Sequence, residues 1–156
     1  MARDLKPGDR APAFSIPADG GGMAALSSFK GKTVVLYFYP KDDTSGCTRE
    51  ALDFSAKRRA FSGAGAVVIG VSKDSPASHD KFKAKHELGV ILGSDMETSV
   101  AEAYGVWVEK SMYGRKYMGM ERATFLIDPK GVIRKVWRKV KVPGHVEDVL
   151  GAAKAI

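Results

Sequence analysis

Short apolar runs alternate with amphipathic segments along most of the chain. The apolar run before Pro40 is rich in β-branched and aromatic residues, which predicts a buried strand over Val34–Tyr39. The next segment predicts a helix over 45–61, because the Gly-rich stretch Ser62–Gly65 then breaks the pattern. A second apolar run predicts a strand over 66–72.

The second half continues this alternation. Ser75 and Pro76 form an N-cap followed by proline at the first helical position, which predicts a helix as far as about His86. The later predicted elements are a short strand over 90–92, a short helix over 98–104, a hairpin of 122–128 and 132–140, and a closing helix over 145–155. Near the start, an apolar region over 12–16 and turn residues over 19–22 predict an N-terminal hairpin.

This order of elements indicates the fold class. Two strand–helix units followed by a hairpin and a helix predict an α/β protein with a central mixed β-sheet flanked by helices. That is the order of a thioredoxin-like fold, here with an N-terminal β-hairpin extension. A chain of 156 residues with 44% hydrophobic and 28% charged residues suits a single domain over 1–156.

The charge pattern and the first residues of the chain argue against nucleic-acid binding and membrane association. The formal net charge is +7, and the densest basic stretch is Arg134–Lys141. Its charges alternate with Val136, Trp137 and Val140 at strand spacing, which predicts a solvated strand edge and no nucleic-acid partner. The start has no apolar signal core, and no apolar run approaches the roughly 20 residues that span a membrane, so we expect a cytoplasmic protein with no membrane partner.

The single cysteine, Cys47, is the strongest candidate for chemistry. Thr44 or Ser45 would cap the predicted helix, which places Cys47 on its first turn. Unpaired backbone N–H groups and the helix dipole stabilise a thiolate there, and the thiolate is the nucleophile. A lone cysteine is more often a small buried hydrophobe. However, Gly46 permits close approach of the backbone to a ligand, and the Thr44 hydroxyl is within reach.

Several segments resemble one enzyme family. Pro40-xxx-Thr44-xx-Cys47 resembles the peroxidatic motif of the peroxiredoxins, and Tyr37–Phe54 resembles the bacterioferritin comigratory protein, or PrxQ, branch. Four other segments resemble this family in the same order: 8–14, 70–74, 121–128 and 137–140. The resemblance covers nearly the whole chain. It implies a thioredoxin-like fold, no cofactor, and a thiol-dependent peroxidase that reduces hydrogen peroxide and organic hydroperoxides.

The resemblance also implies roles for individual residues. Cys47 would attack one peroxide oxygen and become a sulfenic acid, with the backbone N–H groups of Gly46 and Cys47 as donors. Thr44 would accept from the peroxide and donate to the sulfur, and Pro40 would shape the site and limit water access. Arg122 would hold the thiolate and the peroxide. From the residues alone, Arg122 cannot be preferred to Arg49 as the arginine beside the cysteine, and Arg122 could instead pair with Glu121. The resemblance is what assigns this role to Arg122.

A second, resolving cysteine is missing. Many members of the branch carry it where this chain has Leu52, and others carry it in the next helix, near Lys83. Reduction would therefore need an outside thiol, such as thioredoxin, glutaredoxin or glutathione, and an intermolecular Cys47–Cys47 bridge is a weaker alternative. The branch is often monomeric. Ser45 replaces a proline that is common in the family, which predicts a less rigid loop with the spacing intact.

Other interpretations remain open. The segment containing Met112, Tyr113, Tyr117, Met118 and Met120 could wall a pocket for organic hydroperoxides, but completing a core is the favoured interpretation. The three histidines show no metal-ligand spacing, so no metal is expected. A dithiol oxidoreductase is disfavoured because there is no CxxC motif. A non-catalytic redox sensor or binding protein on the same fold is the alternative function.

Overall fold

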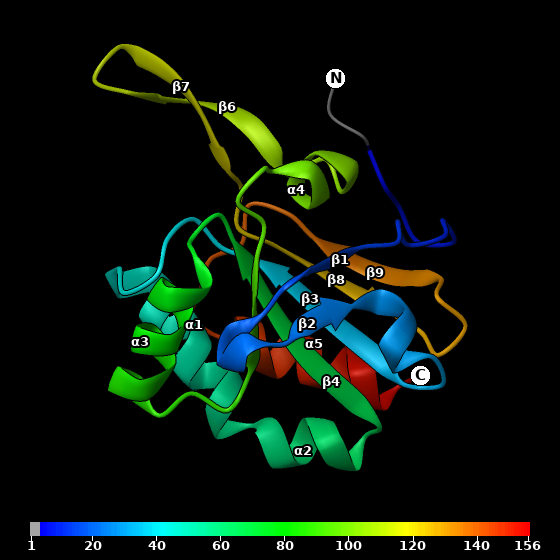
Figure 1. The fold of residues 1–156 in the computed structure, drawn as a ribbon. Coiled ribbons are helices and arrows are strands. Elements are labelled where there is room, and N and C mark those ends of the chain that lie inside the picture. The colour runs from blue at the N-terminus through cyan, green and yellow to red at the C-terminus, as the bar shows by residue number, and fades with distance from the viewer. Residues whose placement is uncertain (1–3) are drawn as a thin grey trace.

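A five-stranded mixed sheet forms the centre of the computed structural model, which describes residues 4–156 (Figure 1). The strand order is β5-β4-β3-β8-β9. The central strand β3 (Thr33–Phe38) pairs parallel with β4 (Ala66–Ser72) and antiparallel with β8 (Ala123–Ile127). β5 (Ile91–Ser94) and β9 (Ile133–Trp137) are the edge strands. The predicted central mixed sheet is confirmed.

Four helices cover one face of the sheet. They are α1 (Ser45–Ala56), α2 (Arg58–Gly63), α3 (Pro76–His86) and α5 (His145–Lys154). Side chains alternate along a strand, and every residue of β3 is buried. Val35 and Tyr37 therefore face these helices, where they pack in one cluster with Phe54, Phe61 and Phe82. The helix that carries Cys47 is thus held against the sheet by its own aromatic residue, Phe54.

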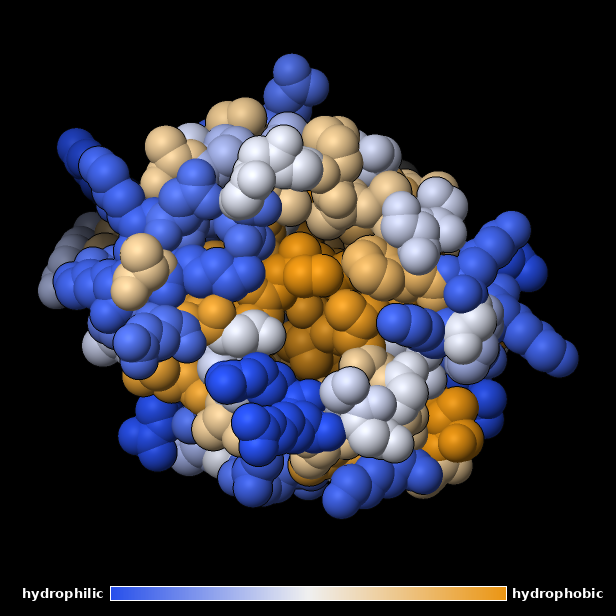
Figure 2. Space-filling model, turned by 60° about the horizontal axis from the view of Figure 1, so that its bottom comes forward, coloured by the Kyte–Doolittle hydropathy of each residue, from blue (hydrophilic) through white to orange (hydrophobic). Residues whose placement is uncertain are grey.

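The other face carries the N-terminal hairpin and one short helix. β1 (Ser15–Pro17) pairs with β2 (Met23–Ala25), with 3-10 turns at Asp19–Gly21 and Leu26–Phe29, and α4 (Ser99–Ala103) lies beyond them. The predicted N-terminal hairpin is therefore confirmed, with its first strand a few residues later. These elements leave the lower end of this face partly open. Figure 2, which turns that end toward the viewer, shows an apolar hollow with hydrophilic residues to its left, to its right and below it.

The predicted helix over 45–61 is wrong in one respect, because the chain breaks at Lys57. This residue has φ −102° and ψ 9°, and its N–H donates to the Phe54 carbonyl at 3.1 Å. The tight turn redirects the chain, so Phe61 on α2 still packs against Phe54, with ring centroids 5.8 Å apart.

A second hairpin over 107–120 was not predicted. β6 (Trp107–Met112) and β7 (Arg115–Met120) join through Tyr113 and Gly114, both with positive φ, as in a type I′ turn. The hairpin projects from the body (Figure 1). Met120 is buried, but the other four residues proposed for a core are exposed, with Tyr113 at 99%. For these four, the core prediction is wrong, because a two-stranded arm has no layer to cover it.

The later helices and the β8–β9 hairpin follow the prediction with shorter bounds, whereas β5 runs over Ile91–Ser94 and is longer than the predicted strand over 90–92. β9 ends at Trp137, and the exposed Arg134 and Lys135 on it form the basic edge that the alternation predicted. No helix in the described residues is both long and apolar enough to cross a bilayer.

Candidate active site

Cys47 lies on the first turn of α1, at the end of the loop that follows β3. Its side chain is only 1% exposed. Thr44 is the N-cap residue, with extended backbone, and the Thr48 N–H donates to the Thr44 carbonyl at 2.8 Å. The backbone N–H groups of residues 45–47 come before this first hydrogen bond of the helix, so they have no acceptor within the helix. The positive end of the helix dipole therefore lies at the cysteine.

Arg122 reaches this turn from a distant part of the chain. It directly precedes β8, and the antiparallel register pairs Ala123 with Phe38, the last residue of β3. This register puts Arg122 beside the loop that leads into α1. Its Nη2 donates to Cys47 Sγ at 3.3 Å. A charged donor that points at the sulfur stabilises negative charge on it.

Glu50 holds the other side of the guanidinium. Arg122 Nη1 donates to Glu50 Oε1 at 2.7 Å, and the Glu50 side chain is completely buried one turn after Cys47. Gly46 leaves room for this arrangement, since a Cβ at that position would lie 3.1 Å from Arg122 Nη2. The guanidinium therefore lies between a carboxylate and the sulfur, and its orientation is fixed at two points.

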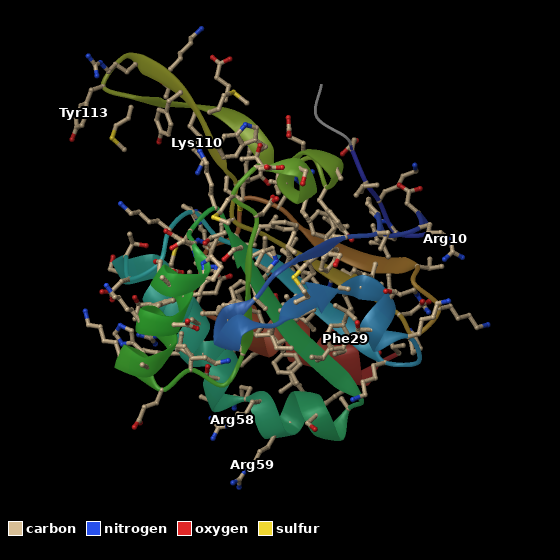
Figure 3. The ribbon with its side chains drawn as sticks, viewed as in Figure 1. Arg10, Phe29, Arg58, Arg59, Lys110 and Tyr113 are labelled. Carbon is tan, nitrogen blue, oxygen red and sulfur yellow. The ribbon has the colours of Figure 1, made fainter. Side chains whose placement is uncertain are left out.

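The charges at this site are coupled. Burial raises the pKa of Glu50 to about 7, although the nearby Arg122 acts to lower it. Burial acts to lower the pKa of Arg122, but Glu50 and Cys47 outweigh it and raise that pKa, so the guanidinium stays charged. Lys110, on β6 of the β6–β7 hairpin (Figure 3), has its pKa lowered by burial and by Arg122. It is a second cation close to the site.

The other residues predicted for the site lie at its rim. Thr44 is exposed, and its hydroxyl donates to the Lys41 carbonyl at 2.8 Å, so although Thr44 occupies the N-cap position, its side chain makes no capping hydrogen bond and none to the sulfur. Pro40 is exposed just beyond the end of β3. Gly46, Cys47 and Arg122 are brought together; Thr44 and Pro40 flank them.

The alternative arginine pairings are settled by the geometry. Arg49 is exposed and pairs with Asp53 at 3.1 Å, so it points away from the sulfur. Glu121 pairs with Arg138 at 2.9 Å, which leaves Arg122 free for Glu50.

The two positions at which the resemblance led us to look for a resolving cysteine hold other side chains. Leu52 is exposed on α1, and Lys83 on α3 pairs with Asp19 at 2.7 Å.

A buried polar network behind the loop was not predicted from the sequence. His79 on α3 is fully buried; its Nδ1 lies 2.7 Å from Asp42 Oδ2 and its Nε2 lies 2.9 Å from the Gly93 carbonyl oxygen. The ring therefore bridges the Asp42 carboxylate and the Gly93 carbonyl. Tyr39 donates to Asp42 Oδ1 at 2.6 Å. The network fixes the loop before Cys47 to α3 and β5.

These omissions have different causes. Glu50 was visible in the sequence, but its position suggested only a favourable charge near a helix start. Asp42 and His79 are 37 residues apart, and no local pattern links them. Among the described residues, no group of three or more His, Cys, Asp or Glu side chains is placed to hold a metal ion.

Comparisons with known proteins assign the chain to one family. Residues 7–136 match the model of the AhpC/TSA family. Peroxiredoxin Bcp of Bacillus subtilis is 50% identical over 147 residues, which cover 94% of each chain.

Solved structures show the same relationship. The bacterioferritin comigratory protein of Xanthomonas campestris has a TM-score of 0.89 at 43% identity, covering 99% of this chain and 98% of its own. A PrxQ mutant of Xylella fastidiosa has a TM-score of 0.93 at 40% identity, covering 98% of both chains. These are thioredoxin-fold peroxiredoxins, which confirms the predicted fold class. The chain therefore belongs to the AhpC/TSA family, in its Bcp/PrxQ branch of thiol-dependent peroxidases, with a single cysteine.

Proposed function

We propose that this chain reduces hydrogen peroxide and organic hydroperoxides through a sulfenic acid on Cys47. The observation that carries the proposal is the contact of Arg122 Nη2 with Cys47 Sγ on the first turn of α1. It places a fixed positive charge beside the only thiol in the chain. The bacterioferritin comigratory protein of Xanthomonas campestris has alkyl peroxide reduction activity, which supports organic hydroperoxides as substrates here.

The first chemical step transfers one oxygen atom. The Cys47 thiolate attacks one peroxide oxygen, the O–O bond breaks, and the second oxygen leaves as hydroxide or alkoxide, which takes up a proton. Negative charge moves from sulfur to the leaving oxygen. Arg122 and the N–H groups of Gly46 and Cys47 supply donors to both atoms. In this proposal Thr44 turns its hydroxyl from the Lys41 carbonyl toward the peroxide, and Pro40 shields the site.

Recycling needs a thiol from outside the chain. A first thiol condenses with Cys47–SOH to give a mixed disulfide and water, and a second thiol releases Cys47 and leaves as the disulfide. The candidates are thioredoxin, glutaredoxin and glutathione. Because Cys47 is 1% exposed, a protein thiol reaches its sulfur only after the first turn of α1 opens. We propose a monomer that works in the cytoplasm, where such reductants keep thiols reduced.

Turnover distinguishes this enzyme from a redox sensor on the same fold. Peroxide consumption is measured with each of the three reductants in turn, for wild type and for Cys47→Ser. We expect sustained consumption with at least one reductant and none with the variant. Oxidation of Cys47 without turnover by any of the three would favour the sensor.

A further inference from the structure

The apolar hollow at the lower end of the sheet lies on the opposite side of the molecule from the proposed chemistry. It opens between the 3-10 turn Leu26–Phe29 and α2, at the end where β3 begins. Cys47 follows the other end of β3, and six residues of strand span roughly 20 Å. A ligand in this hollow would not contact the sulfur.

The floor of the hollow combines the partly buried side chains of Leu26 and Phe29 with the buried side chains of Val34 and Ile127. One cavity of about 210 Å³ is lined by the apolar side chains of Leu26, Phe29, Val34 and Ile127. This volume has room for roughly seven waters at about 30 Å³ each, so a small ligand would fit. A neighbouring hollow of about 400 Å³ continues over Val67 and Ile91, and Lys32 lines both.

Cations surround this floor. Arg10, Lys30, Lys32 and Lys130 line the first cavity, and Arg58 and Arg59 line the second. Figure 3 shows Arg58 and Arg59 on α2 at the bottom of the molecule, below Phe29. Within residues 4–156, none of the six forms an ion pair with a carboxylate. Ion pairs elsewhere engage Lys83, Lys85 and Arg138.

One carboxylate, Asp128, also lines the first cavity, but it is already engaged. Its Oδ1 accepts from the Lys130 and Val132 N–H groups, and its Oδ2 lies 3.5 Å from Arg134 Nη1. It therefore does little to neutralise the rim. An uncovered apolar floor with an excess of unpaired positive charge is complementary to a molecule that has an apolar body and a negative end.

We propose that this hollow binds a small amphipathic anion, an alkyl carboxylate whose chain lies on Phe29 and whose carboxylate is held by Lys30 and Lys32. The chain would displace water from the apolar floor, and the head would pair with cations that now face solvent. This site does not depend on the peroxidase proposal, since it shares no residue with the Cys47 site.

The test is a titration of uniformly ¹⁵N-labelled protein with octanoate, below its micelle concentration, followed by amide chemical shifts. Octanol, which has the apolar chain without the carboxylate, and acetate, which has the carboxylate without the chain, are titrated in parallel as controls. We expect saturable shifts centred on Phe29, Lys32 and Gly131 with octanoate, and at least about fivefold weaker binding of octanol and of acetate.

A charge-matched pair of variants locates the head group. Lys30→Gln with Lys32→Gln should weaken octanoate binding at least about fivefold, whereas Lys81→Gln with Lys154→Gln removes the same charge elsewhere and should leave it unchanged. All four side chains are at least partly solvent-exposed, so both double variants should fold. The proposal is overturned if octanol binds as well as octanoate, if the control pair of substitutions weakens octanoate binding equally, or if the chemical shifts change elsewhere in the protein.

Discussion

At the scale of single residues, the site depends on one arginine placed by strand register. Arg122 is 75 residues from Cys47 in the chain, and a local pattern could not distinguish it from Arg49. Strand register determines which arginine reaches the sulfur. Ala123 opposes Phe38, so Arg122 faces the loop before α1. Cys47 could be predicted from its local context. Its partners Arg122 and Glu50 could not be assigned from residues alone.

Removing the guanidinium should slow the oxidation of Cys47. Arg122→Met keeps much of the apolar stem but removes the donor to Sγ, and we expect a rate constant lower by about 10²- to 10³-fold, as for the loss of other preorganised donors. The matched control is Arg134→Met, since Arg134 is an exposed arginine whose nearest carboxylate is Asp128. Stopped-flow fluorescence gives both rate constants. Equal rates in the two variants would remove Arg122 from the mechanism.

Glu50 should make the fold less stable as the pH rises. Its pKa is about 7 in the folded protein against an ordinary value of 4.5, so the folded state binds the proton more tightly. The resulting stabilisation, up to about 3 kcal/mol, is complete below pH 4.5 and is lost as the pH rises through 7. Glu50→Gln should flatten this part of the pH dependence of the free energy of unfolding. Urea titrations between pH 4 and 8 test it, and an unchanged slope would contradict it.

At the scale of elements, the sequence predicted the order of strands and helices but not two local features. Apolar runs such as 34–39 and 66–72 marked the core strands because those residues are buried on both faces. The break at Lys57 has no glycine or proline to signal it. The β6–β7 hairpin turns at Tyr113-Gly114, and its exposed Met and Tyr side chains suggested a core to any prediction based on hydrophobicity.

The buried contacts of His79 with Asp42 and Gly93 should hold the loop that carries the site. His79→Leu removes one of the hydrogen-bond partners of the buried Asp42 carboxylate, and leaving a buried polar group unsatisfied costs about 1–3 kcal/mol of unfolding free energy. We also expect slower oxidation of Cys47, although His79 does not touch the sulfur. His86→Leu is the control, because His86 pairs with the exposed Asp43, and losing this pair should cost much less unfolding free energy. Similar losses in both variants would count against the loop role.

The hairpin should tolerate polar substitution at its tip. Tyr113→Asn replaces a side chain that is 99% exposed, and asparagine accepts the positive φ of 52°, so unfolding free energy should change by less than about 0.5 kcal/mol. Met120→Ala, at the buried end of the same hairpin, should cost about 2–5 kcal/mol. Chemical denaturation compares the two. A large loss at Tyr113 would mean that the arm is covered in solution.

At the scale of the whole molecule, the sheet and its helices cover the thiol, and the proposed mechanism has to work within that cover. Cys47 packs in the same cluster as Tyr37 and Phe54, so the layer that gives the fold its stability also covers the sulfur. A small peroxide needs to approach only the rim at Arg122, which is 17% exposed. A protein reductant needs a partly opened helix. The peroxide step should therefore be fast and the thiol step limited by local opening.

The central claim is that the folded site activates Cys47 toward peroxide. The most direct test is stopped-flow oxidation of the fully reduced protein by hydrogen peroxide, with intact mass to count the oxygen added. We predict one added oxygen at a rate orders of magnitude above that of free cysteine. If hydrogen peroxide and an alkyl hydroperoxide both react no faster than with free cysteine, the arrangement of Cys47, Arg122 and Glu50 does not activate the thiol, and the peroxidase mechanism is wrong.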